Sequence, residues 1–298
     1  MNAVTIEIEN EIAIVTVDNP PVNALGHAVR KGLADAVAAT DANDAVQAVV
    51  LIAAGRTFMA GADISEFGKP LAEPGLPDVV LMIEGARKPW VAAIHGTALG
   101  GGLEVALGCH YRVVDPKAKL GVPEVHLGLI PGAGGTVRLP RVVPVAKAAE
   151  MVATGKPIGA KDAAACGLAN AVAKGDLRAD AVAFAQEIAG KDLPVALVDR
   201  DPVAPLDPEA WGTVAGKLVA KARGQNSVIR GVDAVADAVR LDGPAALENE
   251  RAIFIELMED PQSAALRHVF FAERSVSKVA AIKGVAPRDL RHVGVIGG

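Results

Sequence analysis

The stretch WVAAIHGTALGGGLE, residues 90–104, contains the pattern that decides the fold. Its first residues, Trp90 to Ile94, form an apolar run of strand length, and the glycines Gly100 to Gly102 follow at a strand-to-helix turn. The same order occurs earlier, where the apolar run Ala48 to Ala53 precedes a glycine-bearing turn at Phe58 to Ile64. We expect both turns at the carboxyl ends of strands, where ligands bind in open α/β sheets.

Outward from these turns, the chain alternates between strand and helix patterns. The predicted elements before residue 143 are strands at 4–8, 12–17, 48–53, 90–94 and 111–114, and helices at 26–40, 79–86 and 102–108. The first two strands are close enough to form a hairpin. The alternation that follows predicts an α/β fold with largely parallel strands covered by helices.

The pattern becomes mostly helical after about Val143. Helices are predicted at 146–154, 160–166, 179–189, 245–258 and 263–279, with a short strand near Ala171. Four prolines between 193 and 208 predict a loop or linker there, and therefore a boundary. We expect a core over 1–192, a helical region over 193–282, and a linker with a partial strand over 283–298.

Composition excludes several classes of protein. Apolar residues make up 51% of the 298, which excludes intrinsic disorder. A net charge of −5 and only 2 Trp, 1 Tyr and 6 Phe disfavour a nucleic-acid partner. The longest charge-free stretch, 89–103, is shorter than the roughly 20 residues of a membrane span. With acidic residues and no basic, apolar leader at its start, the chain is predicted to be cytoplasmic.

Cysteine and histidine carry no recognisable metal or redox pattern. Cys109 and Cys166 have neither disulfide nor metal spacing and are predicted to be small buried residues. His95, His110 and His126 also lack ligand spacing, so they are interpreted as packing or loop residues. No metal site is predicted.

Two carboxylates near the glycine-rich turns are candidates for chemistry. The run Gly100 to Gly102 leaves N–H groups unpaired at a helix start, where they can hold negative charge, but no Lys-Ser or Lys-Thr follows, which rejects a phosphate loop of the Walker type. Glu104 follows the glycines, and Glu124 lies in the apolar segment 121–128. The two are either an acid/base couple or, for Glu104, a helix-start acid stabilised by the helix dipole. The residues alone leave both readings open.

Four motifs in order and spacing resemble the crotonase, or enoyl-CoA hydratase/isomerase, superfamily. They are AGADI at 60–64, ALGGGLE at 98–104, GVPE at 121–124 and PGAGGT at 131–136. Three more resemble the amino-terminal half of bifunctional enoyl-CoA hydratase/3-hydroxyacyl-CoA dehydrogenases of fatty-acid β-oxidation: NPPVNAL at 19–25, GCHYR at 108–112 and FFAER at 270–274. The resemblance covers roughly residues 1 to 190.

This resemblance implies a spiral of ββα units that binds an acyl-CoA thioester and adds water to a trans-2-enoyl-CoA. The N–H groups of Ala62 and Gly101 would hold the thioester oxygen. Glu124 would deliver a proton to the α-carbon, while Glu104 would orient and deprotonate the attacking water. The same couple could shift a double bond between 3-enoyl and 2-enoyl thioesters, which implies Δ3,Δ2-enoyl-CoA isomerase activity as well.

The resemblance further implies contacts with the substrate by the residues around these turns, namely Ala60, Gly61, Asp63, Ile64, Gly100, Pro131 and Gly132. Arg274 and Lys278, four apart on a helix, are expected to bind CoA phosphates or, in the plainer reading, to form a solvated basic face. Asp63 has a structural alternative, which is to orient the loop of Ala62.

The last residues, 293–298, resemble the first strand and glycine of a dinucleotide-binding unit. We therefore expect a truncated bifunctional protein, in which NAD would serve only a missing dehydrogenase domain and hydration would need no cofactor. The helices after residue 206 favour a monomer over a trimer. Two alternative functions stay open: an acyl-CoA binding module without hydratase activity, and a CoA-thioester hydrolase of the same superfamily.

Overall fold

The computed structural model describes residues 2–63, 66, 72–205, 207–276, 284–286 and 288–294. Within these residues, the larger sheet has six strands in the order β1-β2-β3-β4-β6-β9. Their bounds are Val4–Glu9, Ile12–Val17, Ala48–Ala53, Trp90–Ile94, Tyr111–Val114 and Ala171–Val172. Strand β1 is antiparallel to β2, and each later pair is parallel. The predicted hairpin and parallel sheet are confirmed.

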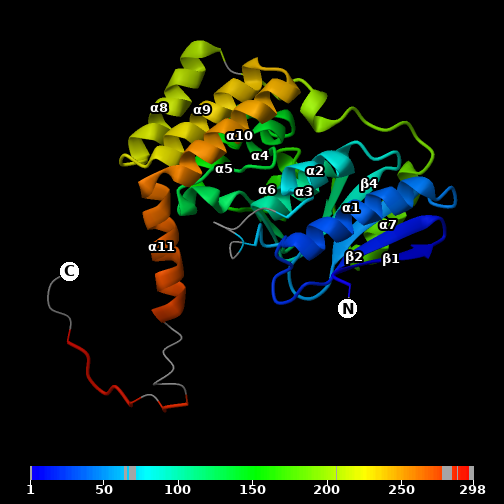
Figure 1. The fold of residues 1–298 in the computed structure, drawn as a ribbon, viewed down its shortest axis with the longest axis horizontal. Helices are drawn as coiled ribbons and strands as arrows, with labels where there is room; N and C mark the ends of the chain where they lie inside the picture. The colour runs from blue at the N-terminus through cyan, green and yellow to red at the C-terminus, as the bar shows by residue number, and fades with distance from the viewer. Residues whose placement is uncertain are drawn as a thin grey trace.

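Helices cover both faces of this sheet because its central strands are apolar on both sides. Val49 and Leu51 of β3 pack in the core beneath α1 (His27–Ala42), α2 (Leu76–Glu84) and α3 (Gly101–Gly108). The alternate residue Val50 faces the opposite way, against Ala181 and Ala185 of α7 (Leu177–Ile188). Figure 1 shows α1 lying along β1 and β2.

A smaller sheet brings two predicted motifs together. Among the described residues it contains β5 (Thr97–Leu99), β7 (Lys119–Gly121) and β8 (Ile158–Gly159) in that order. Leu99 lies opposite Gly121 in the parallel β5-β7 pair, and the Gly100 N–H donates to the Gly121 carbonyl at 2.9 Å. The turn after Leu99 and the 3-10 helix η2 (Pro123–Leu127) therefore start side by side. The sequence analysis missed these strands, which are too short to show a period.

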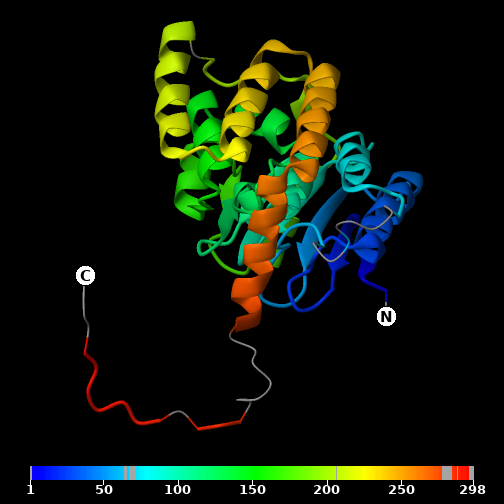
Figure 2. The same ribbon diagram turned by 60° about the vertical axis from the view of Figure 1, so that its left-hand side comes forward.

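The rest of the described chain is mostly helical. Its elements are α4 (Gly135–Arg138), η3 (Leu139–Arg141), α5 (Val145–Thr154), α6 (Ala160–Ala165), η4 (Leu197–Asp199), α8 (Pro208–Lys221), α9 (Asn226–Arg240), α10 (Gly243–Glu259) and α11 (Pro261–Val276). Helix α9 lies at the centre of this region and packs against α4, α5, α8 and α10. Figure 2 shows α8, α9 and α10 as one group above the sheet. The domain limits at 192 and 282 stay predictions.

The long helices α8 and α9 were not predicted, nor were the short α4, η3 and η4. Helix α8 carries a recognisable start, because Asp207 accepts from the N–H groups of Glu209 and Ala210 and a proline occupies the first turn. Its apolar residues Trp211, Ala215 and Leu218 follow a helical spacing, but glycines at 212 and 216 lower the helix propensity. The prolines before residue 208 extend the loop pattern up to its first residue.

Helix α11 begins against the core and then leaves it. Ser263 donates its hydroxyl to the Leu127 carbonyl at 2.9 Å, so the first turn of α11 contacts η2. The far end extends away from the remaining helices in both views (Figures 1 and 2). Residues 277–279 of the predicted helix lie outside the described residues. No helix in the described part of the chain is long and apolar enough to cross a membrane.

Candidate active site

Two backbone N–H groups meet where the glycine-bearing turns approach each other. A β-carbon placed on Gly101 would lie 3.3 Å from the nitrogen of Ala62. The first turn is held there because Leu25 donates its N–H to the Gly61 carbonyl and Leu99 donates to the Met59 carbonyl, both at 3.0 Å. Within the described residues, neither the Ala62 nor the Gly101 N–H donates to an acceptor. The pair forms an open donor site.

Glu104 lies in the first turn of α3, three residues after Gly101, and only 2% of it is exposed. Its Oε1 accepts from the N–H groups of Ala133 at 2.7 Å and Gly135 at 2.9 Å. Its Oε2 has no hydrogen-bond partner among the described residues. Burial raises the pKa of Glu104 well above its usual range. The negative charges of Glu124 and of Glu250 on α10 raise it further. Glu104 thus keeps one oxygen fixed and one available.

Glu124 reaches the same turn from η2. A β-carbon on Gly100 would lie 2.6 Å from Glu124 Oε1, so only glycine permits this approach, and Gly100 also has φ +53°. Glu124 Oε2 is buried without a hydrogen-bond partner. Burial, aided by the charge of Glu250, raises the pKa of Glu124 to about 7. The structure therefore brings Glu104, Glu124, Ala62 and Gly101 together, as the sequence predicted; their chemical roles stay predictions.

A third buried carboxyl, Glu250 of α10, was missed by the sequence analysis. Its Oε1 accepts from the Gly134 N–H at 2.6 Å, and its Oε2 accepts from the Thr136 N–H at 2.7 Å and the Thr136 hydroxyl at 2.6 Å. A signal was present: Glu250 lies on the apolar stripe of the predicted helix 245–258, between the buried Ala246 and Ile253. A charge on such a stripe indicates a buried partner.

The other residues predicted to touch substrate around Ala62 differ in their surroundings. Ala60 is exposed, and its N–H donates to the Val22 carbonyl at 3.1 Å. Gly61 is buried with φ +105°. Asp63 lies beside Gly26 at the start of α1, since a β-carbon on Gly26 would be 3.4 Å from its Oδ2. Ile64 lies outside the described residues.

Pro131 and Gly132 lie between the core and α10. A β-carbon on Gly132 would lie 2.5 Å from the ring of Phe254, and Pro131 is buried against Gly135. A cavity of about 330 Å³ borders Gly132 on the side of α2 and α10. Their contact with substrate stays a prediction.

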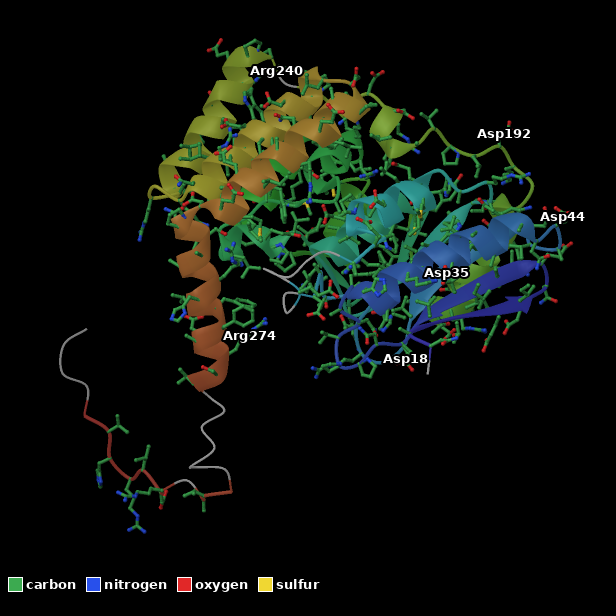
Figure 3. All side chains as sticks on the ribbon, in the orientation of Figure 1. Asp18, Asp35, Asp44, Asp192, Arg240 and Arg274 are labelled. Carbon is green, nitrogen blue, oxygen red and sulfur yellow. The ribbon has the colours of Figure 1, made fainter. Side chains whose placement is uncertain are left out.

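Arg274 lies on the far part of α11, the end that extends away from the sheet (Figure 3). Its guanidinium carbon is 3.7 Å from the centre of the Phe270 ring, four residues earlier on the same helix. Lys278 lies outside the described residues. The CoA-phosphate role of this pair stays a prediction.

The surroundings of His110 and Cys109 are those of buried packing residues. His110 is buried, its Nδ1 accepts from the Trp90 N–H at 3.0 Å, and burial lowers its pKa to about 4. Cys109 is buried, and burial raises the pKa of its thiol to about 12, whereas Cys166 is half-buried. Among the described residues, no three His, Cys, Asp or Glu side chains are grouped so that they could hold a metal ion.

Comparison with known proteins decides the family. A family model described as enoyl-CoA hydratase/isomerase matches residues 7–201. The chain belongs to the enoyl-CoA hydratase/isomerase family. Among solved structures, this family member is similar to carnitinyl-CoA hydratase from Mycobacterium avium, with a TM-score of 0.67 and 30% identity over 92% of this chain and 97% of that one. The predicted family and the α/β fold with a helical carboxyl-terminal region are confirmed.

Curated relatives in the family are longer proteins. The chain is 40% identical to the peroxisomal fatty acid beta-oxidation multifunctional protein of Oryza sativa subsp. japonica, over 99% of this chain and 43% of the relative. It is 36% identical to the peroxisomal bifunctional enzyme of Danio rerio, over 97% of this chain and 41% of the relative. The chain thus spans less than half the length of either relative.

Proposed function

We propose that this chain is an enoyl-CoA hydratase, which adds water to a trans-2-enoyl-CoA and produces a 3-hydroxyacyl-CoA in fatty-acid β-oxidation. The observation that carries the proposal is the convergence of four groups on one turn. Two carboxyl groups, Glu104 and Glu124, flank Gly100, and two N–H groups without acceptors lie beside them. Family membership and the names of the relatives support the same substrate class.

The open N–H pair of Ala62 and Gly101 fits the charge that hydration creates. When water attacks the β-carbon of a 2-enoyl thioester, electron density moves onto the thioester oxygen and an enolate-like species develops. Two fixed donors at this oxygen stabilise the transition state more than the ground state. Their position in a partly buried turn makes the interaction stronger than it would be in water.

Glu104 suits the role of the base that orients water. Its Oε1 is held by two N–H groups, which fixes the carboxyl plane, and Oε2 is left to accept a proton from water. The oxygen of that water bonds to the β-carbon. The fixed geometry reduces the reorganisation needed before attack.

Glu124 suits the role of the acid. With a pKa of about 7, it carries a proton in a large fraction of molecules near neutral pH. Transfer of this proton to the α-carbon completes the addition. The couple still holds one proton, which Glu104 has taken from water and which must return to Glu124 before the next turnover. Two like charges in one buried site favour a state in which the couple shares one proton.

Isomerisation of 3-enoyl-CoA to 2-enoyl-CoA is a second proposed activity of the same site. It requires one group to remove a proton from the α-carbon and return it to the γ-carbon, and the buried, unpartnered Oε2 of Glu124 suits this transfer. Glu104 would not be needed, since no water is added. Measuring both activities therefore distinguishes the role of Glu104 from that of Glu124.

The test is the loss of 2-enoyl absorbance when purified protein of residues 1–298 is mixed with crotonyl-CoA. We expect turnover that falls strongly in both Glu104→Gln and Glu124→Gln. Affinity for acyl-CoA without turnover would instead support a binding module. Release of free CoA, followed with a thiol reagent, would support a thioester hydrolase.

We also propose the cofactor use, location and oligomeric state of the protein. Hydration would use water and the two carboxyl groups with no cofactor beyond the CoA of the substrate. The protein would be cytoplasmic and monomeric, although the relatives above are named as peroxisomal. Fractionation of cells and light scattering of the purified chain test these two points.

A further inference from the structure

Loop 131–136, whose last two residues begin α4, is held by two carboxyl groups. Glu104 precedes the loop in the sequence and Glu250 follows it. Going along the loop, the N–H groups of Ala133 and Gly135 donate to Glu104, while those of Gly134 and Thr136 donate to Glu250. Four consecutive amides thus alternate between two acceptors. The orientation that presents one pair of N–H groups to Glu104 also presents the other pair to Glu250.

We propose that Glu250, on α10 of the helical region, is a positioning residue for Glu104: it binds Gly134 and Thr136 so that the amides of Ala133 and Gly135 point at the Glu104 carboxylate. The inference rests on the proposed hydratase function for its effect on rate. Its structural part, coupling of the two carboxyl groups through one loop, stands independently of the reaction.

The loop is closely packed on one side and borders a cavity on the other. The cavity of about 330 Å³ is lined by Gly132, Ala133 and Gly134 as well as by Glu250, so the loop has space to move on that side. On the cavity side, the hydrogen bonds to Glu250 restrain the loop. A glycine in the left-handed region, Gly134 with φ +95°, adds freedom that these bonds must restrain.

The groups around Glu250 show that its hydrogen bonds favour the ionised form. Three donors point at its oxygens, and a carboxylate can accept from all of them. Burial raises the pKa of Glu250, whereas the hydrogen bonds from Thr136 and Gly134 and the charge of Arg138 lower it. Arg138 also donates to the Ala133 carbonyl at 3.2 Å and pairs with Glu84 on α2 at 2.6 Å.

The charge of Glu250 also reaches the reacting couple. It raises the pKa of both Glu104 and Glu124. The charged groups nearest Glu250 are Glu104 from α3, Glu124 from η2, and Arg138 from α4, which pairs with Glu84 from α2. The cavity beside Glu250 is also lined by Glu73, by Asp78 of α2 and by Arg251 of α10. Removing the Glu250 charge should therefore lower the pKa of Glu124, which a purely structural role of Glu250 would not do.

The experiment compares Glu250→Gln with wild type and with Glu248→Gln, which changes an exposed glutamate of the same helix. We expect kcat for hydration of crotonyl-CoA to fall about 10- to 100-fold in Glu250→Gln with little change in KM, because the substrate site is intact but Glu104 is displaced. The alkaline limb of the pH profile should move to lower pH. Glu248→Gln should match wild type, and Glu250→Asp, which keeps the charge, should keep the wild-type limb.

Amide hydrogen exchange gives a readout that does not depend on activity. In Glu250→Gln, exchange should accelerate at Ala133 and Gly135, which donate to Glu104, as well as at Gly134 and Thr136. If Glu250→Gln does not fold, Thr136→Val removes one donor without a charge change and should raise exchange at Ala133 and Gly135 to a smaller extent.

Two results would overturn the inference. One is unchanged exchange at Ala133 and Gly135 when Glu250 or Thr136 is substituted. The other is an active wild type whose kcat and pH profile are unaltered in a folded Glu250→Gln. A wild type that shows no hydration, with exchange at Ala133 and Gly135 still coupled to Glu250, would instead refute the proposed function alone.

Discussion

The molecule has two glycine-bearing regions that present backbone N–H groups, and it uses them in opposite ways. At Ala62 and Gly101 the N–H groups have no acceptor among the described residues, whereas at loop 131–136 four successive N–H groups donate to Glu104 or Glu250. The first region is available for a ligand oxygen, and the second holds the protein's own carboxylates. Glycine-rich sequence alone therefore does not identify an oxyanion site; the partners of its amides do.

Replacing the proton donor should have the largest effect on rate. Glu124→Gln keeps the size of the side chain but removes the proton, so hydration of crotonyl-CoA should fall about 10³-fold or more, and isomerisation of a 3-enoyl-CoA should be lost with it. Absorbance assays measure both. Glu150→Gln, an exposed site on α5, is the control. Retention of both activities in Glu124→Gln would remove Glu124 from the mechanism.

The base should matter for only one of the two reactions. In Glu104→Gln, the side chain can still accept from Ala133 and Gly135 but no longer deprotonates water, so hydration should fall about 10²- to 10³-fold. Isomerisation should stay within about tenfold of wild type, since it needs no attacking water. Equal losses of hydration and isomerisation would show that Glu104 is needed for both reactions, contrary to the proposal.

The open amides can be tested by removing one donor. Gly101→Pro lacks the N–H, and proline is tolerated at the first position of a helix, whereas Gly101→Ala adds a β-carbon and keeps the N–H. Turnover in Gly101→Pro should be about 10²-fold below that of Gly101→Ala. Equal turnover in the two variants, both folded by circular dichroism, would indicate that the contrast between open and occupied amides has no catalytic meaning.

The smallest expected effect concerns stability. The pKa of Glu124 is raised to about 7 in the folded protein. Its contribution to stability is therefore complete at pH below about 4.5, the unfolded value, and is lost as pH rises through 7. Glu124→Gln should be more stable than wild type by about 2 kcal/mol at pH 8 and similar at pH 4. Urea unfolding at both pH values measures this; a variant equally destabilised at both would contradict the shift.

The sequence predicted the large sheet well because its central strands are long, apolar and separated by helical periods. Trp90 to Ile94 and Ala48 to Ala53 form strands with the predicted bounds. Strands such as β8, with two residues, have no period and form only because β7 lies beside them. Helix α9 has its apolar residues at helical spacing, but its valines and Gly231 have low helix propensity, which weakened the pattern.

The site residues also differ in how well the sequence predicted them. Glu104 lies three residues after Gly101 and Glu124 three residues after Gly121, and the motifs of the family contain both. Glu250 binds Gly134 from 116 residues away, so no local pattern connects the two. Only a charge on the apolar stripe of α10 hinted that a buried partner exists.

The most direct test of the account is a crystal structure of the protein with a bound 3-hydroxyacyl-CoA. The account predicts the thioester oxygen about 2.7–3.1 Å from the nitrogens of both Ala62 and Gly101, with the 3-hydroxyl beside Glu104 and the α-carbon beside Glu124. A thioester oxygen held elsewhere, with these two N–H groups still empty, would contradict it.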